Sequence, residues 1–243
     1  MCFTFSEAQV LRVGPKAGIL ASQPLHDEPA YREEFRSIPA LGFQAGAAMN
    51  VKVSERFSLQ SEFMYQRVGK HVKSNFVSDF HKERFDYLSL PLLLQASHRI
   101  GYSEFYINAG PSVSYWLGGK GKVKTGEVLE EGIEVLDYTI TFDRTAEANN
   151  VFFVGNNPNL FQLGLDVGGG VYLPVGAQLL MLDLRYTWGH TNMVREQESY
   201  IPISFFNDDL RHSHQTLTLS VAYLFSFDIY QLSTKGKSTS GKK

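Results

Sequence analysis

Hydrophobic and polar side chains alternate along two stretches of the chain, Phe85 to Ile100 and Phe105 to Leu117, which a short turn separates. Successive side chains of a strand point to opposite faces, so the second stretch has an apolar face with Ile107 and Val113 and a small, polar face with Asn108. Both stretches exceed the usual strand length of about five or six residues. Because roughly ten residues carry a tilted strand across a bilayer, the pattern predicts a hairpin of membrane-spanning strands.

The same alternation recurs along the chain and predicts eight strands. They cover Val10 to Ala21, Leu41 to Val53, Phe57 to Val72, Phe85 to Ile100, Phe105 to Leu117, Asn159 to Leu173, Ala177 to Val194, and His214 to Asp228. Short turns are expected at Ser54 to Arg56, Gly101 to Glu104, and Pro174 to Gly176. Long polar connections are expected near Gln23 to Ala40, Lys73 to Arg84, Gly118 to Pro158, and Arg195 to Ser213.

Outer-membrane barrels alternate short periplasmic turns with longer extracellular loops. We therefore predict an all-β fold, an eight-stranded antiparallel transmembrane β-barrel over residues 10–230. An even number of strands places both termini in the periplasm. In the third long connection, Lys120 to Val128 and Val135 to Phe142 alternate weakly, and they are candidates for a hairpin that continues beyond the membrane.

A soluble up-and-down barrel has the same alternation with its apolar face inside. Two features besides the turn and loop lengths favour the membrane. The second face of each strand carries Gly, Ser, Ala, Asn and Gln, which suit a narrow lumen better than a solvated surface. Aromatic residues also gather near strand ends, as in the interfacial bands of membrane barrels. We expect these bands to hold Phe57, Phe105, Tyr172, Phe225 and Phe227 at the turn side, and Tyr65, Phe85, Tyr115, Phe161 and Trp188 at the loop side.

Composition agrees with this prediction. Aromatic residues make up 13% of the 243 residues, which suits a pleated sheet. The net charge of −2 gives no basic surplus for nucleic acid. The mean hydropathy of −0.17 is ordinary for a barrel, because half of each strand faces a polar interior. No apolar run reaches the 18 residues that a membrane helix needs.

The two ends of the sequence differ from the barrel pattern. Residues 1–9, MCFTFSEAQ, read as the remnant of a secretory leader with a small residue, Ala8, before Gln9. Cleavage there removes Cys2, the single cysteine of the chain. The alternative is an ordinary frayed N-terminus. Residues 231–243 are basic and without pattern, and they predict a flexible periplasmic tail.

Several strand sequences together resemble the PorT-like outer-membrane β-barrel family of Bacteroidota. They are YLSLPLLL from Tyr87, FYINAGPSVSYWL from Phe105, GLDVGGGVYL from Gly164, LDLRYTWGHTN from Leu182 and LSVAYLF from Leu219. The family includes a component of the type IX protein secretion system. The resemblance implies a non-enzymatic barrel that acts through contacts with other secretion or envelope proteins and with outer-membrane lipid. A generic barrel for envelope stability or for binding an extracellular ligand or adhesion target is the alternative.

Four charged residues fall on the small, polar faces of the predicted strands: Glu62, Asp166, Asp183 and Arg185. Eight strands leave an interior only wide enough for side chains. The turn after Pro174 sets Asp166 opposite or diagonal to Arg185. Because buried charges need partners, we predict a salt-bridged cluster that plugs the lumen. Structural filling is favoured over a transport or proton path.

The last long connection offers a candidate for chemistry. His212 and His214 share a strand face, and Asp208 and Asp209 lie close to them in sequence, a set that could serve a rim hydrolase or a metal site. The spacing fits neither a catalytic triad nor a metal motif, so a solvated loop end is favoured. We expect no enzyme activity, no metal and no small-molecule cofactor.

Aromatic side chains in the connections form a candidate contact surface for another protein. These residues are Phe35, Phe76, Phe80, Phe152, Phe153, Phe205 and Phe206. They can equally pack on one another above the barrel, and the sequence leaves both interpretations open.

Overall fold

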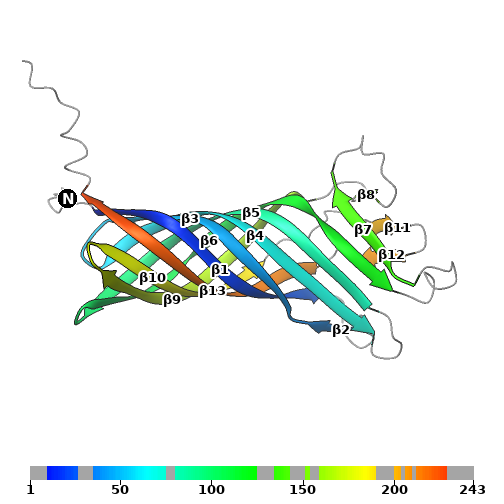
Figure 1. Ribbon diagram of the computed structural model, residues 1–243, viewed down its shortest axis with the longest axis horizontal. Helices are drawn as coiled ribbons and strands as arrows, with labels where there is room; N and C mark the ends of the chain where they lie inside the picture. The colour runs from blue at the N-terminus through cyan, green and yellow to red at the C-terminus, as the bar shows by residue number, and fades with distance from the viewer. Residues whose placement is uncertain are drawn as a thin grey trace, which may run out of the picture.

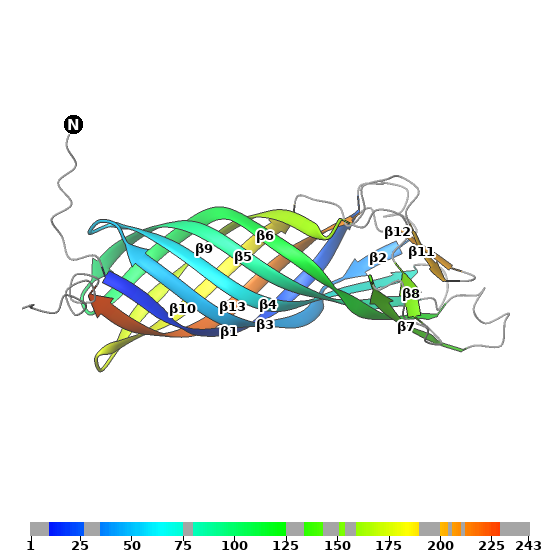
Figure 2. The same ribbon diagram turned by 90° about the horizontal axis from the view of Figure 1, so that it is seen from above.

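Eight long antiparallel strands form a closed ring in the computed structural model, and Figures 1 and 2 show its elongated shape. The structure describes residues 10–26, 35–74, 80–124, 134–142, 151–153, 159–189, 200–203, 206–209 and 212–228. The eight strands are β1 (Val10–His26), β3 (Ala40–Lys52), β4 (Phe57–Ser74), β5 (Phe80–Ile100), β6 (Ser103–Lys124), β9 (Phe161–Val175), β10 (Gln178–Gly189) and β13 (His212–Asp228). Each pairs with the next in this order, and β13 returns to pair with β1. The predicted eight-stranded antiparallel barrel is confirmed.

The two ends of the barrel differ. At the turn end, β3 joins β4, β5 joins β6 and β9 joins β10, and the start of β1 pairs with the end of β13. At the opposite end, the loop end, lie the short strands β2 (Phe35–Ile38), β7 (Leu136–Thr141), β8 (Val151–Phe153), β11 (Tyr200–Ile203) and β12 (Phe206–Asp209) (Figure 1). In the described part of the chain, no helix is long and apolar enough to cross a membrane.

Tight turns close the hairpins at the turn end. Gly101 and Gly176 have φ angles of +62° and +63°, the left-handed conformation that glycine adopts without steric cost. Each begins a two-residue turn, followed by Tyr102 and Ala177 respectively. Such turns match the twist of the paired strands, so the glycines set the register of both hairpins.

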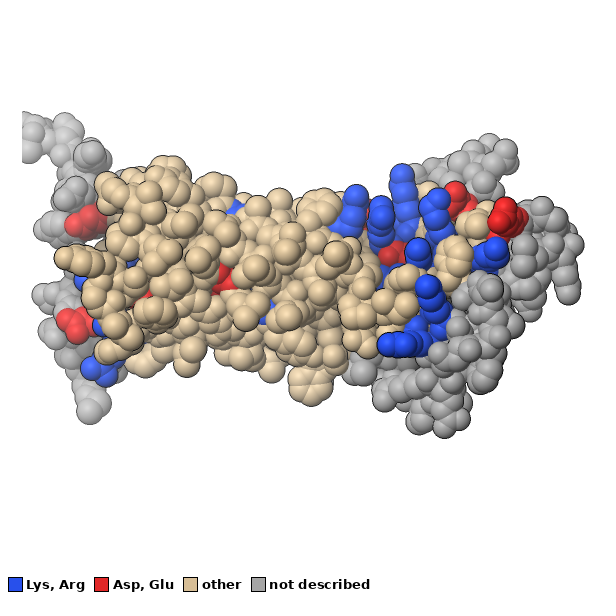
Figure 3. All heavy atoms as spheres, turned by 60° about the horizontal axis from the view of Figure 1, so that its bottom comes forward, with Lys and Arg blue, Asp and Glu red and all other residues tan. Residues whose placement is uncertain are grey.

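The outer wall of the barrel is apolar and its interior is polar. Ile107 is 70% exposed and Leu184 is 52% exposed, whereas Gln95 and Asp183 are buried. Figure 3 shows the middle of the wall almost without charged side chains. A soluble barrel has the opposite arrangement. The wall is therefore a surface for lipid, with alternate residues turned to the lumen.

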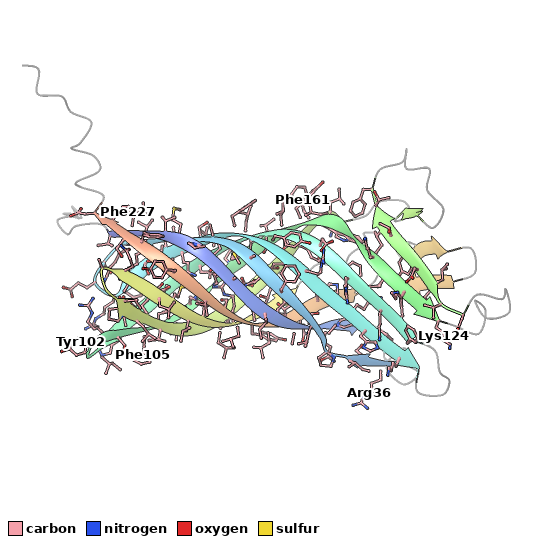
Figure 4. The ribbon with its side chains drawn as sticks, viewed as in Figure 1. Arg36, Tyr102, Phe105, Lys124, Phe161 and Phe227 are labelled. Carbon is pink, nitrogen blue, oxygen red and sulfur yellow. The ribbon has the colours of Figure 1, made fainter. Side chains whose placement is uncertain are left out.

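Aromatic side chains lie on this wall near both ends, with two corrections to the prediction. Figure 4 labels Phe105 and Phe227 at the turn end and Phe161 toward the loop end. Tyr172 and Phe85 were expected in these bands, but both are fully buried in the lumen. A position near a strand end does not determine the face of the strand. The face is determined by whether the residue number is odd or even, because successive side chains point to opposite faces. Phe85 and Tyr172 lie an even number of positions from inward-pointing neighbours, so they also point inward.

Toward the loop end, several strands extend beyond the residues that the hydrophobic alternation assigned to them. The stretch from Lys73 to Arg84 was expected as a loop, but β4 reaches Ser74 and β5 begins at Phe80. β6 pairs with β9 up to Tyr115 and, beyond an irregularity in its pairing with β5, with β7 from Gly119 to Val123. The expected hairpin beyond the membrane is thus made by β6 and β7. Beyond the lipid the outward face needs no apolar residues, so hydropathy does not mark these strands.

Candidate functional site

A layer of charged side chains crosses the middle of the lumen. Arg185 on β10 donates two hydrogen bonds to Glu62 on β4, each 2.9 Å, and lies 3.1 Å from Asp183. Lys16 on β1 lies 2.7 Å from Glu62 and 3.0 Å from Asp183. Asp166 on β9 is diagonal to Arg185 in the sheet, at 3.9 Å from its nearer guanidinium nitrogen. The structure therefore brings together the four residues singled out from the sequence and adds Lys16.

Lys16 is the member of this layer that the sequence reasoning missed. A signal in the sequence could have found it, because Lys16 has the same parity as Gly14 and Gly18 and therefore lies on the small face of the first strand. In the sheet its neighbours are Gly46 and Ala222. These small residues leave room in the lumen, and the long lysine side chain occupies it. The side chain is fully buried.

Neutral polar side chains donate further hydrogen bonds to the carboxylates of this layer. Gln60 donates to Glu62 at 2.6 Å, Tyr106 donates to Asp183 at 2.8 Å, and Ser112 donates to Asp166 at 3.1 Å. A buried ion pair is stable only when its remaining hydrogen-bonding positions are satisfied. The layer is therefore a connected network that holds strands from all around the ring.

A second charged group lies nearer the turn end. Arg12 donates to Glu104 at 2.9 Å, and Ser97 donates to the other carboxylate oxygen at 2.7 Å. The Arg12 guanidinium also lies over the ring of Tyr172, 4.8 Å from its centroid. Tyr172 in turn packs against Tyr106, with ring centroids 4.8 Å apart. Rings thus fill the space between the two charged layers.

The lumen toward the loop end is filled by aromatic rings. Phe85, Tyr87 and Trp116 are buried there with Val68. His214 also lies in this group, its ring centroid 5.2 Å from that of Phe85. Below them is a cavity of about 50 Å³, room for one or two water molecules. In the described part of the chain, side chains occupy the lumen at every level from Arg12 to Trp116.

A third charged group lies above these rings, beyond the apolar part of the wall. Tyr138 donates to Glu83 at 2.5 Å, His81 contacts both residues, and Lys70 lies 3.3 Å from Glu83. Burial by itself raises the pKa of Glu83. The charges of His81 and Lys70, with hydrogen bonds from His81 and Tyr138, more than offset burial and hold that pKa below its ordinary value.

The candidate rim set of His212, His214, Asp208 and Asp209 is not assembled by the described residues. His214 is turned into the lumen, not toward a solvated rim, so it does not assemble the rim set expected from the sequence. The side chains of His212, Asp208 and Asp209 lie outside the described residues. Among the residues described, no cluster of three or more His, Cys, Asp or Glu side chains could hold a metal ion.

Of the candidate contact surface, the structure describes one side chain. Phe80 begins β5, is partly buried, and has the Lys82 ammonium 5.3 Å from its ring centroid. Phe35 lies in β2, Phe152 and Phe153 in β8, and Phe206 in β12, with side chains that lie outside the description. Phe76 and Phe205 lie outside the described residues, as do residues 1–9 and 229–243.

The closed ring, the apolar wall and the filled polar lumen define a transmembrane β-barrel. The pattern of the family described as outer membrane protein beta-barrel domain matches residues 6–195. The chain belongs to this family, and it is an outer-membrane barrel.

Solved structures of other outer-membrane barrels are similar to this chain at low identity. Neisserial surface protein A is 13% identical, with 89% of this chain and 97% of that chain covered and a TM-score of 0.41. OprG from Pseudomonas aeruginosa is 10% identical, with 90% and 95% covered and a TM-score of 0.48. Ail, the attachment invasion locus protein of Yersinia pestis, is 14% identical, with 88% and 99% covered and a TM-score of 0.38. No protein of curated function matches the chain.

Proposed function

We propose that this protein is a closed, non-enzymatic outer-membrane barrel that acts through contacts of its loop end with other envelope proteins. The observation that supports a closed barrel is the central layer, in which Lys16, Glu62, Asp183 and Arg185 are bonded to one another across the lumen. A solute would have to break buried ion pairs to pass, at a cost of several kcal/mol. The protein then acts through the surface of its loop end and not by passing solutes through the lumen.

Conductance in a planar lipid bilayer tests the closed barrel. The wild-type protein is expected to give no sustained channel current. A variant with Tyr106, Glu62 and Arg185 all changed to Ala removes the middle of the filling and serves as the matched open control. Steady ohmic current through the wild-type protein at a level similar to that of the control would contradict the proposal.

The specific role that we propose is that of a type IX protein secretion component. Its support is the resemblance of the strand sequences to the PorT-like family, together with the closed lumen. In a clean deletion strain, proteins with type IX sorting domains are expected to disappear from the medium and to accumulate in the periplasm, and the wild-type gene should restore them. Normal secretion would contradict this role. It would leave a generic barrel that stabilises the envelope or binds an extracellular ligand.

We also propose that the turn end and both termini face the periplasm. The even number of strands and the tight turns support this orientation. In a Cys2→Ser background, a cysteine at Glu134, which is exposed at the loop end, should react with an impermeant maleimide on whole cells. A cysteine at Ala177, exposed at the turn end, should react only after lysis. The reverse labelling pattern would overturn the orientation.

A further inference from the structure

A block of cations covers one outward face of the barrel just beyond the apolar wall. Lys82 on β5 pairs with Lys122 on β6, and Arg84 on β5 pairs with Lys120 on β6. All four side chains point outward and are exposed. Figure 3 shows this concentration of blue side chains at the loop end, beside the nearly uncharged wall. We refer to these four residues as the basic block.

The basic block is an unfavourable arrangement for an isolated sheet. Like charges on directly opposite residues of neighbouring strands destabilise the pairing, and here two such pairs are adjacent. Two acidic side chains lie near the block on this face. Asp137 bonds to Lys122 at 2.9 Å, and Asp86, diagonal to Lys120 in the sheet, is bonded to Arg67 at 2.7 Å. In the described part of the chain, no carboxylate forms an ion pair with Lys82, Arg84 or Lys120, which points to an anionic ligand from outside the chain.

A groove beside the basic block could accommodate such a ligand. It has a volume of about 880 Å³ and runs over β4 to β7, lined by all four residues of the basic block and by His71. Its opposite edge is apolar and includes Leu41, which is 83% exposed. The groove thus presents cations on one side and hydrocarbon on the other, at the level where the wall of the barrel leaves the lipid.

The charge of Lys82 acts on His71, which also lines the groove. Burial lowers the pKa of His71, and the charges of Lys82 and Lys73 lower it further. A neighbouring cation disfavours a protonated imidazole, so the direction of this shift agrees with a positive potential beside the groove. The carboxylate of Glu83 is turned inward to Lys70.

We propose that the basic block and its groove bind the phosphorylated head group of an outer-leaflet glycolipid of the lipid A type. Clusters of Lys and Arg at a membrane boundary bind anionic lipid heads. A glycolipid matches both edges of the groove, since its phosphates meet Lys82, Arg84 and Lys120 while its acyl chains lie beside Leu41 and the wall. The proposal rests on the orientation proposed above, with the loop end outside.

Native mass spectrometry of the refolded barrel in zwitterionic detergent tests the proposal. Lipid A is expected to remain bound to the wild-type protein, and phosphate-free lipid A to be retained at least tenfold less. The variant Arg84→Gln/Lys120→Gln should bind lipid A at least tenfold more weakly. The matched control Arg56→Gln/Arg99→Gln removes two exposed cations at the turn end and should change binding less than twofold. Heat-modifiable migration in gels verifies that each variant is folded.

Four results would overturn this proposal, and the first three concern lipid A itself. They are equal loss of lipid A in the control variant, equal retention of phosphate-free lipid A, and displacement of lipid A by inorganic phosphate at an equal concentration of phosphate groups. Equally tight binding of phosphatidylglycerol would also overturn it, because the site would then not be specific to the glycolipid. The secretion and conductance experiments do not depend on these outcomes. A barrel that binds lipid A and leaves secretion unchanged would refute only the proposed secretion role.

Discussion

Replacing Arg185 with Leu is the sharpest test of the central layer. Leucine removes the two hydrogen bonds to Glu62 and the contact with Asp183, while it keeps an apolar side chain of moderate size in the lumen. Lys16 then remains as the cation that is bonded to both Glu62 and Asp183. The side chain of Glu62 is only 1% exposed, so water cannot take over the lost bonds without entering the lumen.

The expected loss is large relative to the stability of a domain. Removing one member of a buried, hydrogen-bonded ion pair costs about 3–5 kcal/mol, because it leaves a buried charge without compensation. A typical domain has about 5–15 kcal/mol of stability in total. The free energy of unfolding of the Arg185→Leu variant should therefore fall by about 3 kcal/mol or more.

Urea unfolding of the barrel in lipid vesicles measures this loss. Tryptophan fluorescence, from Trp188 on the lipid-facing wall and Trp116 in the lumen, reports the exit of the chain from the membrane, and the gel shift of unboiled samples gives an independent reading. Arg99→Leu is the matched control, since Arg99 is exposed near the turn end. Its stability should change by no more than about 0.5 kcal/mol.

A double variant measures the coupling between Arg185 and Glu62 directly. In Arg185→Leu/Glu62→Leu both members of the strongest pair are absent, so no carboxylate of that pair is left buried. Its loss should be about 1–3 kcal/mol smaller than the sum of the two single losses. An unchanged unfolding midpoint for Arg185→Leu, or additive losses in the double variant, would refute the reasoning and indicate a hydrated lumen.

Three further predictions follow from the same geometry. Lys16→Met should cost about 3 kcal/mol in urea unfolding, and a loss below about 1 kcal/mol would remove Lys16 from the network. Leu184→Arg, which puts a charge on the lipid-facing wall, should cost about 2–4 kcal/mol in the same assay, and no loss would place Leu184 outside the membrane. Because the pKa of Glu83 is lowered in the folded state by His81 and Lys70 despite its burial, its stabilising contribution is complete at neutral pH. It should decline as the pH falls below its unfolded value of about 4.5, so the stability difference between wild type and Glu83→Gln should shrink in acid, and a difference that grows would contradict the assignment.

The sequence was sufficient to predict which residues form the apolar outer wall of the barrel. Alternation along Leu88 to Leu94 and along Leu180 to Leu184 assigns each residue to one of two faces, because side chains of a strand repeat every second residue. It also placed Glu62, Asp166, Asp183 and Arg185 on the inward faces, but it did not single out Lys16. It failed where polarity on both faces hid the period, as between Lys73 and Arg84, and where position near a strand end was used in place of parity, as for Phe85 and Tyr172.

Which inward residues meet across the lumen was decided by the closed structure. Lys16 and Asp183 are 167 positions apart, and Arg185 and Glu62 are 123 positions apart. A local pattern specifies the face of each side chain but not its height in the barrel, which depends on how every strand is staggered against the next around the ring. The same is true of the basic block, since four cations on two strands become one site only through the pairing of β5 with β6. The sequence alone therefore determined the inside and the outside of this protein, and the register of the closed sheet determined its contacts.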